Sequence, residues 1–243
     1  MKKNVLNTDL NGKTAVVTGA GGVLCSAFAK TLARAGAKVA LEVEKDFGSC
    51  DILINGAGGN NPRATTDKEY FEIQDIDAET KTFFDLDADG VAFVFNLNFL
   101  GVLIPTQIFA KQMIGKEGCN ILNISSMNAF TPLTKIPAYS GAKAAVSNFT
   151  QWLAVHFSKV GIRVNAIAPG FFSTKQNASL LFNADKTPTP RTGKILAATP
   201  MGRFGEADEL EGSILFLLNN DAAGFITGVV LPVDGGFSAY SGV

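Results

Sequence analysis

The chain has 243 residues, of which 47% are hydrophobic and 18% charged. This length and composition are typical of one compact domain with a substantial core, and they exclude a disordered or collagenous chain. The 21 basic and 22 acidic residues give a formal net charge of −1, so bulk electrostatics favours neither nucleic acid nor an anionic membrane as a partner. We therefore expect the partner to be a small-molecule substrate.

Cysteine and histidine usage indicates the compartment and excludes some kinds of site. The three cysteines have no CxxC spacing, which argues against a disulfide framework or a zinc site. The first 13 residues are polar, and no apolar run reaches the roughly 18 residues of a membrane span. A single histidine, His156, disfavours multi-histidine metal sites and Ser-His-Asp hydrolases. We expect a cytoplasmic protein with no metal and no membrane partner.

Short apolar segments alternate with helix-length segments along the chain. Because the apolar segments are continuous rather than alternating, they are typical of parallel strands buried on both faces. The expected strands are 15–17, 38–41, 52–54, 121–124, 164–167 and 229–231. The expected helices are 24–35, 99–114 and 142–160, and a glycine follows each as a suitable C-cap. The order predicts a doubly wound parallel α/β sheet within a single domain, residues 1–243.

Two stretches do not fit this alternation. Only about nine residues separate the runs ending at Leu41 and starting at Asp51, whereas a parallel crossover needs a dozen or more. Our hypothesis is that about 30 residues, one βαβ unit, are omitted near Glu42, and a genuine deletion is the alternative. The other stretch, about residues 172–199, is polar and rich in proline. It predicts a long loop with a short helix that covers the substrate.

A glycine-rich turn follows the first expected strand. It reads Thr18-Gly19-Ala20-Gly21-Gly22-Val23-Leu24-Cys25 and opens into the first expected helix. Such a turn can present backbone N–H groups and a helix N-terminus to a pyrophosphate. A second glycine-rich turn, Asn55-Gly56-Ala57-Gly58-Gly59, follows another strand. Open α/β sheets bind ligands beyond such strand ends.

A serine, a tyrosine and a lysine follow later in the chain. Asn123-Ile124-Ser125-Ser126 ends a further strand, and Tyr139 comes thirteen residues after Ser126. Lys143 is four residues beyond Tyr139, so the two share one helix face. An ammonium beside a phenol lowers the phenol's pKa, which suits tyrosine to general acid–base catalysis.

With these motifs in order, the chain resembles the short-chain dehydrogenase/reductase family over nearly its whole length. The motifs that carry the resemblance are Thr18-Gly19, Asn55-Gly56-Ala57-Gly58, Asn98-Phe99-Leu100-Gly101, Asn123-Ile124-Ser125-Ser126, Tyr139 to Lys143, Pro169-Gly170 with Thr174, and Val233-Asp234-Gly235-Gly236. The resemblance implies a Rossmann-like fold and a nicotinamide cofactor, NAD or NADP. It also implies a homo-oligomer, a dimer or tetramer, formed through the helices that carry Asn98 and Tyr139.

The resemblance implies a catalytic tetrad of Asn98, Ser126, Tyr139 and Lys143. Tyr139 would exchange a proton with the substrate oxygen, and Ser126 would hydrogen-bond that oxygen. Lys143 would hold the nicotinamide ribose and tune Tyr139, while Asn98 would keep a water linking Lys143 to solvent. The cofactor would contact the following residues: Thr18, Gly19, Gly21, Gly22, Val23, Leu24, Asn55, Ala57, Gly58, Tyr139, Lys143, Pro169, Gly170, Phe172 and Thr174.

The first glycine turn departs from the family pattern TGxxxGxG. Val23 and Cys25 stand where the second and third glycines belong, and valine does not readily adopt a positive φ. We therefore expect an altered backbone path in this turn. The residue that distinguishes NAD from NADP would follow the second strand, near the suspected omission, so the sequence leaves the choice open.

The substrate is inferred from weaker similarities. The first turn, the stretch 61–66 and the segment 199–204 are similar to short-chain enzymes described as D-mannonate oxidoreductases, that is, fructuronate reductases. A sugar acid needs hydrogen-bond partners and a cation for its carboxylate. Arg63, Asn128 and Lys175 are the predicted substrate ligands, and Arg191 is a further cation near the expected cleft. The alternatives are a 3-oxoacyl thioester reductase and a non-catalytic dinucleotide-binding sensor.

Overall fold

A computed structural model describes residues 8–40, 49–173, 181–183, 185 and 187–242. Six parallel strands form one sheet in the order β2-β1-β3-β4-β5-β6. Their bounds are β1 Thr14–Thr18, β2 Lys38–Ala40, β3 Ile52–Asn55, β4 Cys119–Ile124, β5 Ile162–Pro169 and β6 Val230–Val233. The predicted α/β class with a Rossmann-like parallel sheet is confirmed, and each expected strand is present within a few residues of its expected bounds.

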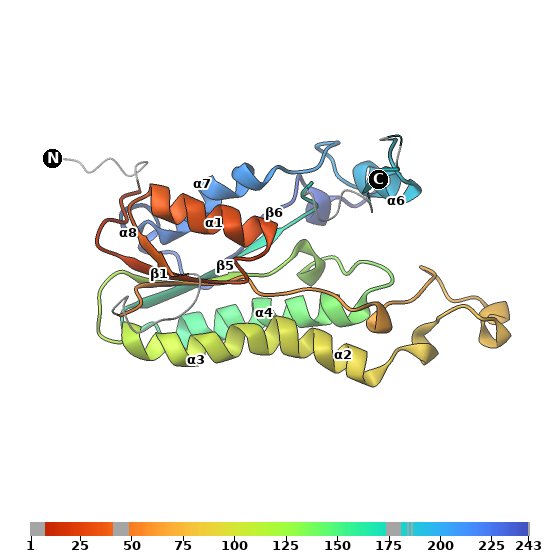
Figure 1. Ribbon diagram of the computed structural model, residues 1–243, viewed down its shortest axis with the longest axis horizontal. Helices are drawn as coiled ribbons and strands as arrows, with labels where there is room; N and C mark the ends of the chain where they lie inside the picture. Colours follow the sequence, from red (N-terminus) through yellow and green to blue (C-terminus); the bar gives the residue numbers. More distant parts are fainter. Residues whose placement is uncertain (1–7, 41–48, 174–180, 184, 186, 243) are drawn as a thin grey trace.

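Helices cover both faces of the sheet (Figure 1). On one face lie α1 Val23–Arg34, α7 Glu211–Leu218 and α8 Asn220–Ala223, and on the other α2 Ala88–Phe95, α3 Gly101–Met113 and α4 Pro137–His156. Each face has its own core. Phe28 and Leu32 of α1 pack against β1 and β3 on the first, and Met113 and Leu153 pack against β4 on the second. This two-sided burial explains why the strands read as continuous apolar runs.

Two helices begin earlier in the chain than predicted. The helix expected at 99–114 starts at α2, where the Asp87 carboxylate caps the first turn by accepting a hydrogen bond from the Gly90 N–H (2.6 Å). It continues through η4, a π-helical turn at Asn96–Leu100, into α3. The helix expected at 142–160 starts at Pro137, because proline suits the first position of a helix. Tyr139 therefore lies in the first turn of α4.

The run Ala88–Met113 is long and apolar enough to span a membrane, and an 18-residue window within it has a mean hydropathy of 1.7. It nevertheless forms part of this domain, because α2 and η4 both pack against α4. Several large side chains remain exposed along this run and on α4, namely Phe93, Phe95, Leu100, Ile104, Ile108 and Trp152.

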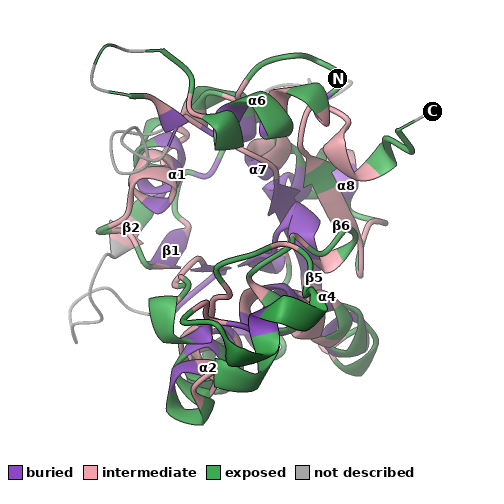
Figure 2. Ribbon diagram, turned by 90° about the vertical axis from the view of Figure 1, so that its right-hand side faces the viewer, coloured by how far each residue is buried: buried purple, intermediate pink, exposed green. Residues whose placement is uncertain are grey.

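Two further segments lie at the end of the molecule drawn on the right in Figure 1. Segment 65–87 contains the short helices η2 Ile73–Asp77 and η3 Phe83–Asp85, and it projects beyond α2. The predicted loop 172–199 contains the expected short helix, α6 Pro190–Ala197. Viewed from this end, the outward surfaces of α2 and α6 are largely exposed (Figure 2). The suspected omission near Glu42 lies outside the described residues.

Candidate active site

The parallel strands bring the predicted motifs to one edge of the sheet. Thr18 ends β1, and its hydroxyl accepts hydrogen bonds from the backbone N–H groups of Gly56 (3.1 Å) and Ala57 (3.4 Å), just beyond β3. Gly19 completes this junction with φ +75°, and a Cβ on it would lie 2.7 Å from the Ala57 nitrogen. The two glycine-rich turns are thereby held together.

The first turn fits an anion. Gly22 is the N-cap of α1, and no side chain caps the helix, so its first N–H groups remain available at the positive end of the helix dipole. A Cβ placed on Gly21 would meet no atom within 4 Å, so the space beside the turn is open. The pyrophosphate of a dinucleotide fits this arrangement.

The reason for expecting an altered backbone path at this turn, a positive φ at Val23, does not hold. Val23 is the first residue of α1, and Lys135 is the only non-glycine residue with a positive φ in the described chain. Val23 therefore needs no unfavourable conformation. The Cys25 sulfur occupies the space that a Cβ on Gly56 would need, so the cysteine packs closely against the second glycine turn.

Ser126, Tyr139 and Lys143 come together as the sequence predicted. Ser126 lies just beyond β4, and its side chain hydrogen-bonds the Tyr139 phenol. The Lys143 ammonium lies 5.7 Å from the centre of the Tyr139 ring and donates to the Ile124 carbonyl (2.8 Å). A phenol, a hydroxyl and an ammonium thus meet at one strand end.

Burial dominates the titration of these groups. It raises the pKa of the Tyr139 phenol, and the hydrogen bond from Ser126 opposes that rise. Burial lowers the pKa of the Lys143 ammonium to about 8. The sequence predicted that the ammonium lowers the phenol pKa, but in the protein alone burial raises it and the lowering cause is Ser126. The phenol is therefore protonated at neutral pH, which is the form that can donate a proton to a carbonyl oxygen.

Asn98 lies beside these groups in the π-helical turn η4, a feature frequent at functional sites. Its amide donates to the carbonyls of Gly59 (2.7 Å) and Val94 (2.8 Å), and its oxygen accepts from the Gly59 N–H (3.2 Å). A Cβ on Gly58 would lie 2.7 Å from the Asn98 side-chain oxygen and 3.0 Å from the Lys143 nitrogen. The second glycine turn therefore allows Asn98 and Lys143 to approach it closely.

Substituting Gly58→Ala tests this close approach. The added methyl group must displace Asn98 or Lys143, and misplacing such groups by about 1 Å costs up to roughly 100-fold in rate. We expect kcat to fall at least about tenfold. The matched control is Gly59→Ala, whose Cβ meets only a Leu97 methyl group at 3.4 Å and should leave kcat nearly unchanged. Equal rates for both variants, measured by dinucleotide absorbance, would contradict this assignment.

Other predicted cofactor residues differ in what their side chains can do. The Asn55 amide is fully buried and donates to Thr106 (3.0 Å) and Asn123 (2.9 Å), so it joins β3 to β4 and α3. Phe172 is buried in the core, and its neighbour Phe171 lines two pockets. Gly170 lacks a Cβ where Asp234 packs against it. Leu24 is partly buried against the core, and Pro169 ends β5. Thr174 lies outside the described residues.

The predicted substrate ligands also differ. Asn128 is buried next to Ser126, and its side-chain oxygen has no hydrogen-bond partner. The Arg63 guanidinium is exposed and bonded to the Asp87 carboxylate (2.8 Å). A substrate carboxylate at Arg63 would therefore compete with Asp87. Lys175 lies outside the described residues.

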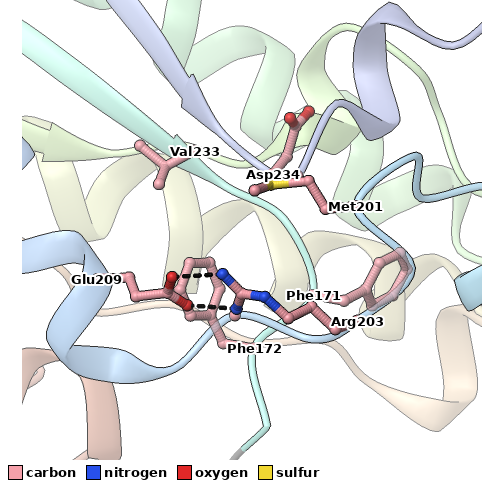
Figure 3. A pocket seen from close by; sticks show the side chains of 9 residues that line it. Phe171, Phe172, Met201, Arg203, Glu209, Val233 and Asp234 are labelled. Carbon is pink, nitrogen blue, oxygen red and sulfur yellow. Dashed lines mark hydrogen bonds and ion pairs between the residues drawn. The ribbon is translucent and has the colours of Figure 1, made fainter.

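A cavity of about 440 Å³ lies beside the N-terminal end of α4. The loop 133–136, Phe171 and helix α6 contribute to its wall. Arg191, which we expected near the cleft, lines this cavity. Lys135 also lines it and was not predicted, although the position of Lys135 between Ser126 and Tyr139 in the chain could have suggested this role. A smaller cavity of about 90 Å³ contains Arg203, which Glu209 holds through two hydrogen bonds of 2.6 and 2.7 Å (Figure 3). Its guanidinium is therefore already neutralised.

Comparison with known proteins agrees with this geometry. A family model of short-chain dehydrogenases, described as Enoyl-(Acyl carrier protein) reductase, matches residues 31–238. The chain belongs to the short-chain dehydrogenase/reductase family, and it is a nicotinamide-dependent oxidoreductase acting on CH–OH groups. The predicted family and class of enzyme are confirmed.

Three individual proteins illustrate the similarity. An uncharacterized oxidoreductase of Haemophilus influenzae is 57% identical, with 98% of this chain and 97% of the relative covered. A crystal structure of a candidate D-mannonate oxidoreductase from Haemophilus influenzae, with bound NAD, has a TM-score of 0.91 at 57% identity and covers 98% of this chain and 99% of that one. A gluconate 5-dehydrogenase of Burkholderia cenocepacia, in complex with NADP and tartrate, has a TM-score of 0.78 at 26% identity, with coverage of 97% and 99%.

The alignment with the Haemophilus oxidoreductase also shows a difference in length. It extends over 277 positions, whereas the whole chain has 243 residues. At least 34 of the aligned positions are therefore gaps in this chain.

Proposed function

We propose that this enzyme reduces the keto group of a sugar acid such as D-fructuronate to the hydroxyl of a product such as D-mannonate, and catalyses the reverse oxidation. The observation that carries the proposal is the convergence of Ser126, Tyr139 and Lys143 near a cavity whose lining combines apolar and cationic side chains. The candidate D-mannonate oxidoreductase and the gluconate 5-dehydrogenase among the similar structures support a sugar acid as the substrate.

The tetrad residues have distinct tasks in this mechanism. The nicotinamide cofactor, when bound, supplies a hydride to the carbonyl carbon. Tyr139 donates its phenolic proton to the carbonyl oxygen, and Ser126 hydrogen-bonds the same oxygen as negative charge develops. Lys143 would hold the nicotinamide ribose through its ammonium, and Asn98 would keep a water that links Lys143 to solvent. Asn128, with its unpaired side-chain oxygen, hydrogen-bonds a substrate hydroxyl.

The two glycine turns and the end of β5 would hold the dinucleotide. The first turn of α1 would bind the pyrophosphate through backbone N–H groups, with Gly21 and Gly22 leaving room for it. Ala57 and Gly58 of the second turn, and Gly170 after β5, would line the rest of the site. The residue expected to contact the ribose 2′ position lies outside the described residues. We therefore propose NAD or NADP as the cofactor.

A substrate panel tests the function. The protein is offered NADH and then NADPH, with fructuronate, a second keto-sugar acid and a 3-oxoacyl thioester in parallel, and dinucleotide absorbance is followed. We expect rapid oxidation of NADH or NADPH when fructuronate is offered. Oxidation of the dinucleotide with the thioester alone would instead identify an acyl thioester reductase. Dinucleotide binding without turnover of any compound would identify a sensor.

We propose that the enzyme acts in the cytoplasm as a homo-oligomer. All three cysteines are free, as in a reducing compartment. Phe95, Ile104, Ile108 and Trp152 expose an apolar face along the helices that carry Asn98 and Tyr139, whereas Phe109 on the same run is buried in the core. An exposed face made of several large apolar side chains is typical of subunit contacts.

We also propose that the natural protein has a further unit between β2 and β3. These parallel strands lie on either side of β1, yet β2 ends at Ala40 and β3 begins at Ile52, which is short for a parallel crossover. The 34 or more gaps in the Haemophilus alignment match one βαβ unit in size. We predict that mass spectrometry of the protein from its native source exceeds 25.6 kDa by roughly 30 residues. A mass matching the 243 residues would show a genuine deletion.

A further inference from the structure

The cavity beside α4 has an apolar wall and a charged part. Phe171 and Phe237 pack edge to face with their ring centres 5.4 Å apart, and both line the cavity. Lys135, Arg191, Lys194 and Glu69 supply its charges. An apolar pocket with a few convergent charges is the usual form of a small-molecule site.

The charges in this cavity do not cancel. The Lys194 ammonium lies 2.7 Å from the Glu69 carboxylate, so these two groups neutralise each other. The pair also links α6 to segment 65–87. In the described part of the chain, the side chains of Lys135 and Arg191 form neither an ion pair nor a hydrogen bond, although the Lys135 ammonium helps the Lys194 ammonium to lower the pKa of Glu69. Two positive charges are therefore left for a ligand.

The backbone at Lys135 is in an unusual conformation. Its φ is +72°, and a non-glycine residue in the left-handed region costs roughly 1 kcal/mol or more. The Thr66 N–H donates to the Lys135 carbonyl (2.9 Å) and holds this conformation. Strained residues of this kind concentrate at ligand-binding positions.

The cavity lies beside the start of the helix that carries Tyr139. Ile136 lines it and is the N-cap of α4, which carries Tyr139 in its first turn. Phe171 lines it from the segment that follows β5, beside the proposed dinucleotide site. A substrate with its carbonyl at Ser126 and Tyr139 can therefore extend into the cavity.

We infer that Lys135 and Arg191 together bind the carboxylate of the substrate, and that this pair makes the enzyme select sugar acids over neutral sugars. The inference rests on the proposed function for the identity of the substrate. Arg191 offers a planar fork that matches a carboxylate, and Lys135 adds a second positive charge. Arg63 is bonded to Asp87 and is not needed for this role.

Substitutions that remove charge test the inference by kinetics. We expect Lys135→Gln and Arg191→Gln each to raise KM for fructuronate about tenfold, and the double variant roughly 100-fold, while kcat changes little. Arg191→Lys should restore part of the loss. Turnover of D-fructose, the neutral counterpart, should be unaffected in all variants. The matched control is Lys159→Gln, because Lys159 is exposed beyond the opposite end of α4.

Equilibrium binding separates this inference from the proposed function. D-mannonate, and D-mannitol as its neutral counterpart, are titrated calorimetrically into protein saturated with the reduced dinucleotide, where no turnover takes place. Weaker mannonate binding in both single variants, with mannitol unaffected, supports the inference even if fructuronate proves not to be reduced. Unchanged mannonate binding in both variants overturns the inference, and reduction of fructuronate by the wild type would then leave the proposed function standing. Absence of mannonate binding to the wild type overturns the inference as well.

Discussion

Substituting Tyr139→Phe should reduce kcat by about 10²–10⁴-fold while leaving dinucleotide affinity within about twofold. The substitution removes only the hydroxyl that Ser126 hydrogen-bonds. The ring and its contact with the Lys143 ammonium are retained, so the site should keep its shape. Turnover is measured by dinucleotide absorbance, and affinity by the fluorescence of the bound reduced dinucleotide.

Tyr240→Phe is the matched control for this prediction. Tyr240 is 49% exposed near the end of the described chain, and losing its hydroxyl should leave kcat unchanged. Full turnover by Tyr139→Phe would show that another group transfers the proton. A parallel loss of dinucleotide binding would instead show that the phenol mainly supports the cofactor site.

Substituting Lys143→Met should lower kcat/KM about 100-fold or more, because both the cation that holds the ribose and the charge beside Tyr139 are lost. In contrast to Tyr139→Phe, dinucleotide affinity should also fall. Steady-state kinetics together with dinucleotide titration separates the two variants. Unchanged dinucleotide affinity in Lys143→Met would contradict the ribose-binding role.

The same variant should be more stable than the wild type at neutral pH when no dinucleotide is bound. The native protein releases the Lys143 proton near its pKa of about 8, whereas the unfolded chain holds it up to 10.5. Below pH 8 the full penalty of burying the ammonium is present, on the order of 3 kcal/mol. The wild-type free energy of unfolding should therefore rise between pH 8 and 10.5, where the unfolded state binds more protons.

Urea unfolding of the two proteins at pH 7 and at pH 10 measures this effect. The stability advantage of Lys143→Met should be largest at pH 7 and should shrink at pH 10. An advantage that does not change with pH would show that Lys143 titrates in the native state as it does in the unfolded chain.

The sheet was predictable from sequence because its strands are buried on both faces and therefore read as short apolar runs. The helix starts were less predictable. The start at α2 depends on the Asp87 cap and the start of α4 on Pro137, and both lie several residues before the strongly periodic segments. The Lys194–Glu69 pair links α6 to segment 65–87, and its partners are 125 residues apart in the chain. Periodicity cannot indicate such a contact.

The candidate tetrad was predictable because Ser126, Tyr139 and Lys143 occur in recognisable local motifs at strand and helix ends. The environment of these groups was not, because burial depends on the whole fold. Burial reverses the predicted direction of the Tyr139 pKa. In the same way, Arg63 follows a strand-end motif, but its partner Asp87 comes from the start of α2. The cavity beside α4, which Lys135 lines, forms only when α6 packs near the loop before α4.

Transfer of deuterium tests the central claim most directly. The protein is incubated with D-fructuronate and the reduced dinucleotide deuterated at the hydride position, and the product is analysed by NMR and mass spectrometry. The proposed function predicts D-mannonate carrying one deuterium on the carbon that held the carbonyl, formed at least about 100-fold more slowly by Tyr139→Phe. Absence of deuterium in the sugar acid, while the wild-type protein binds the dinucleotide, would contradict it.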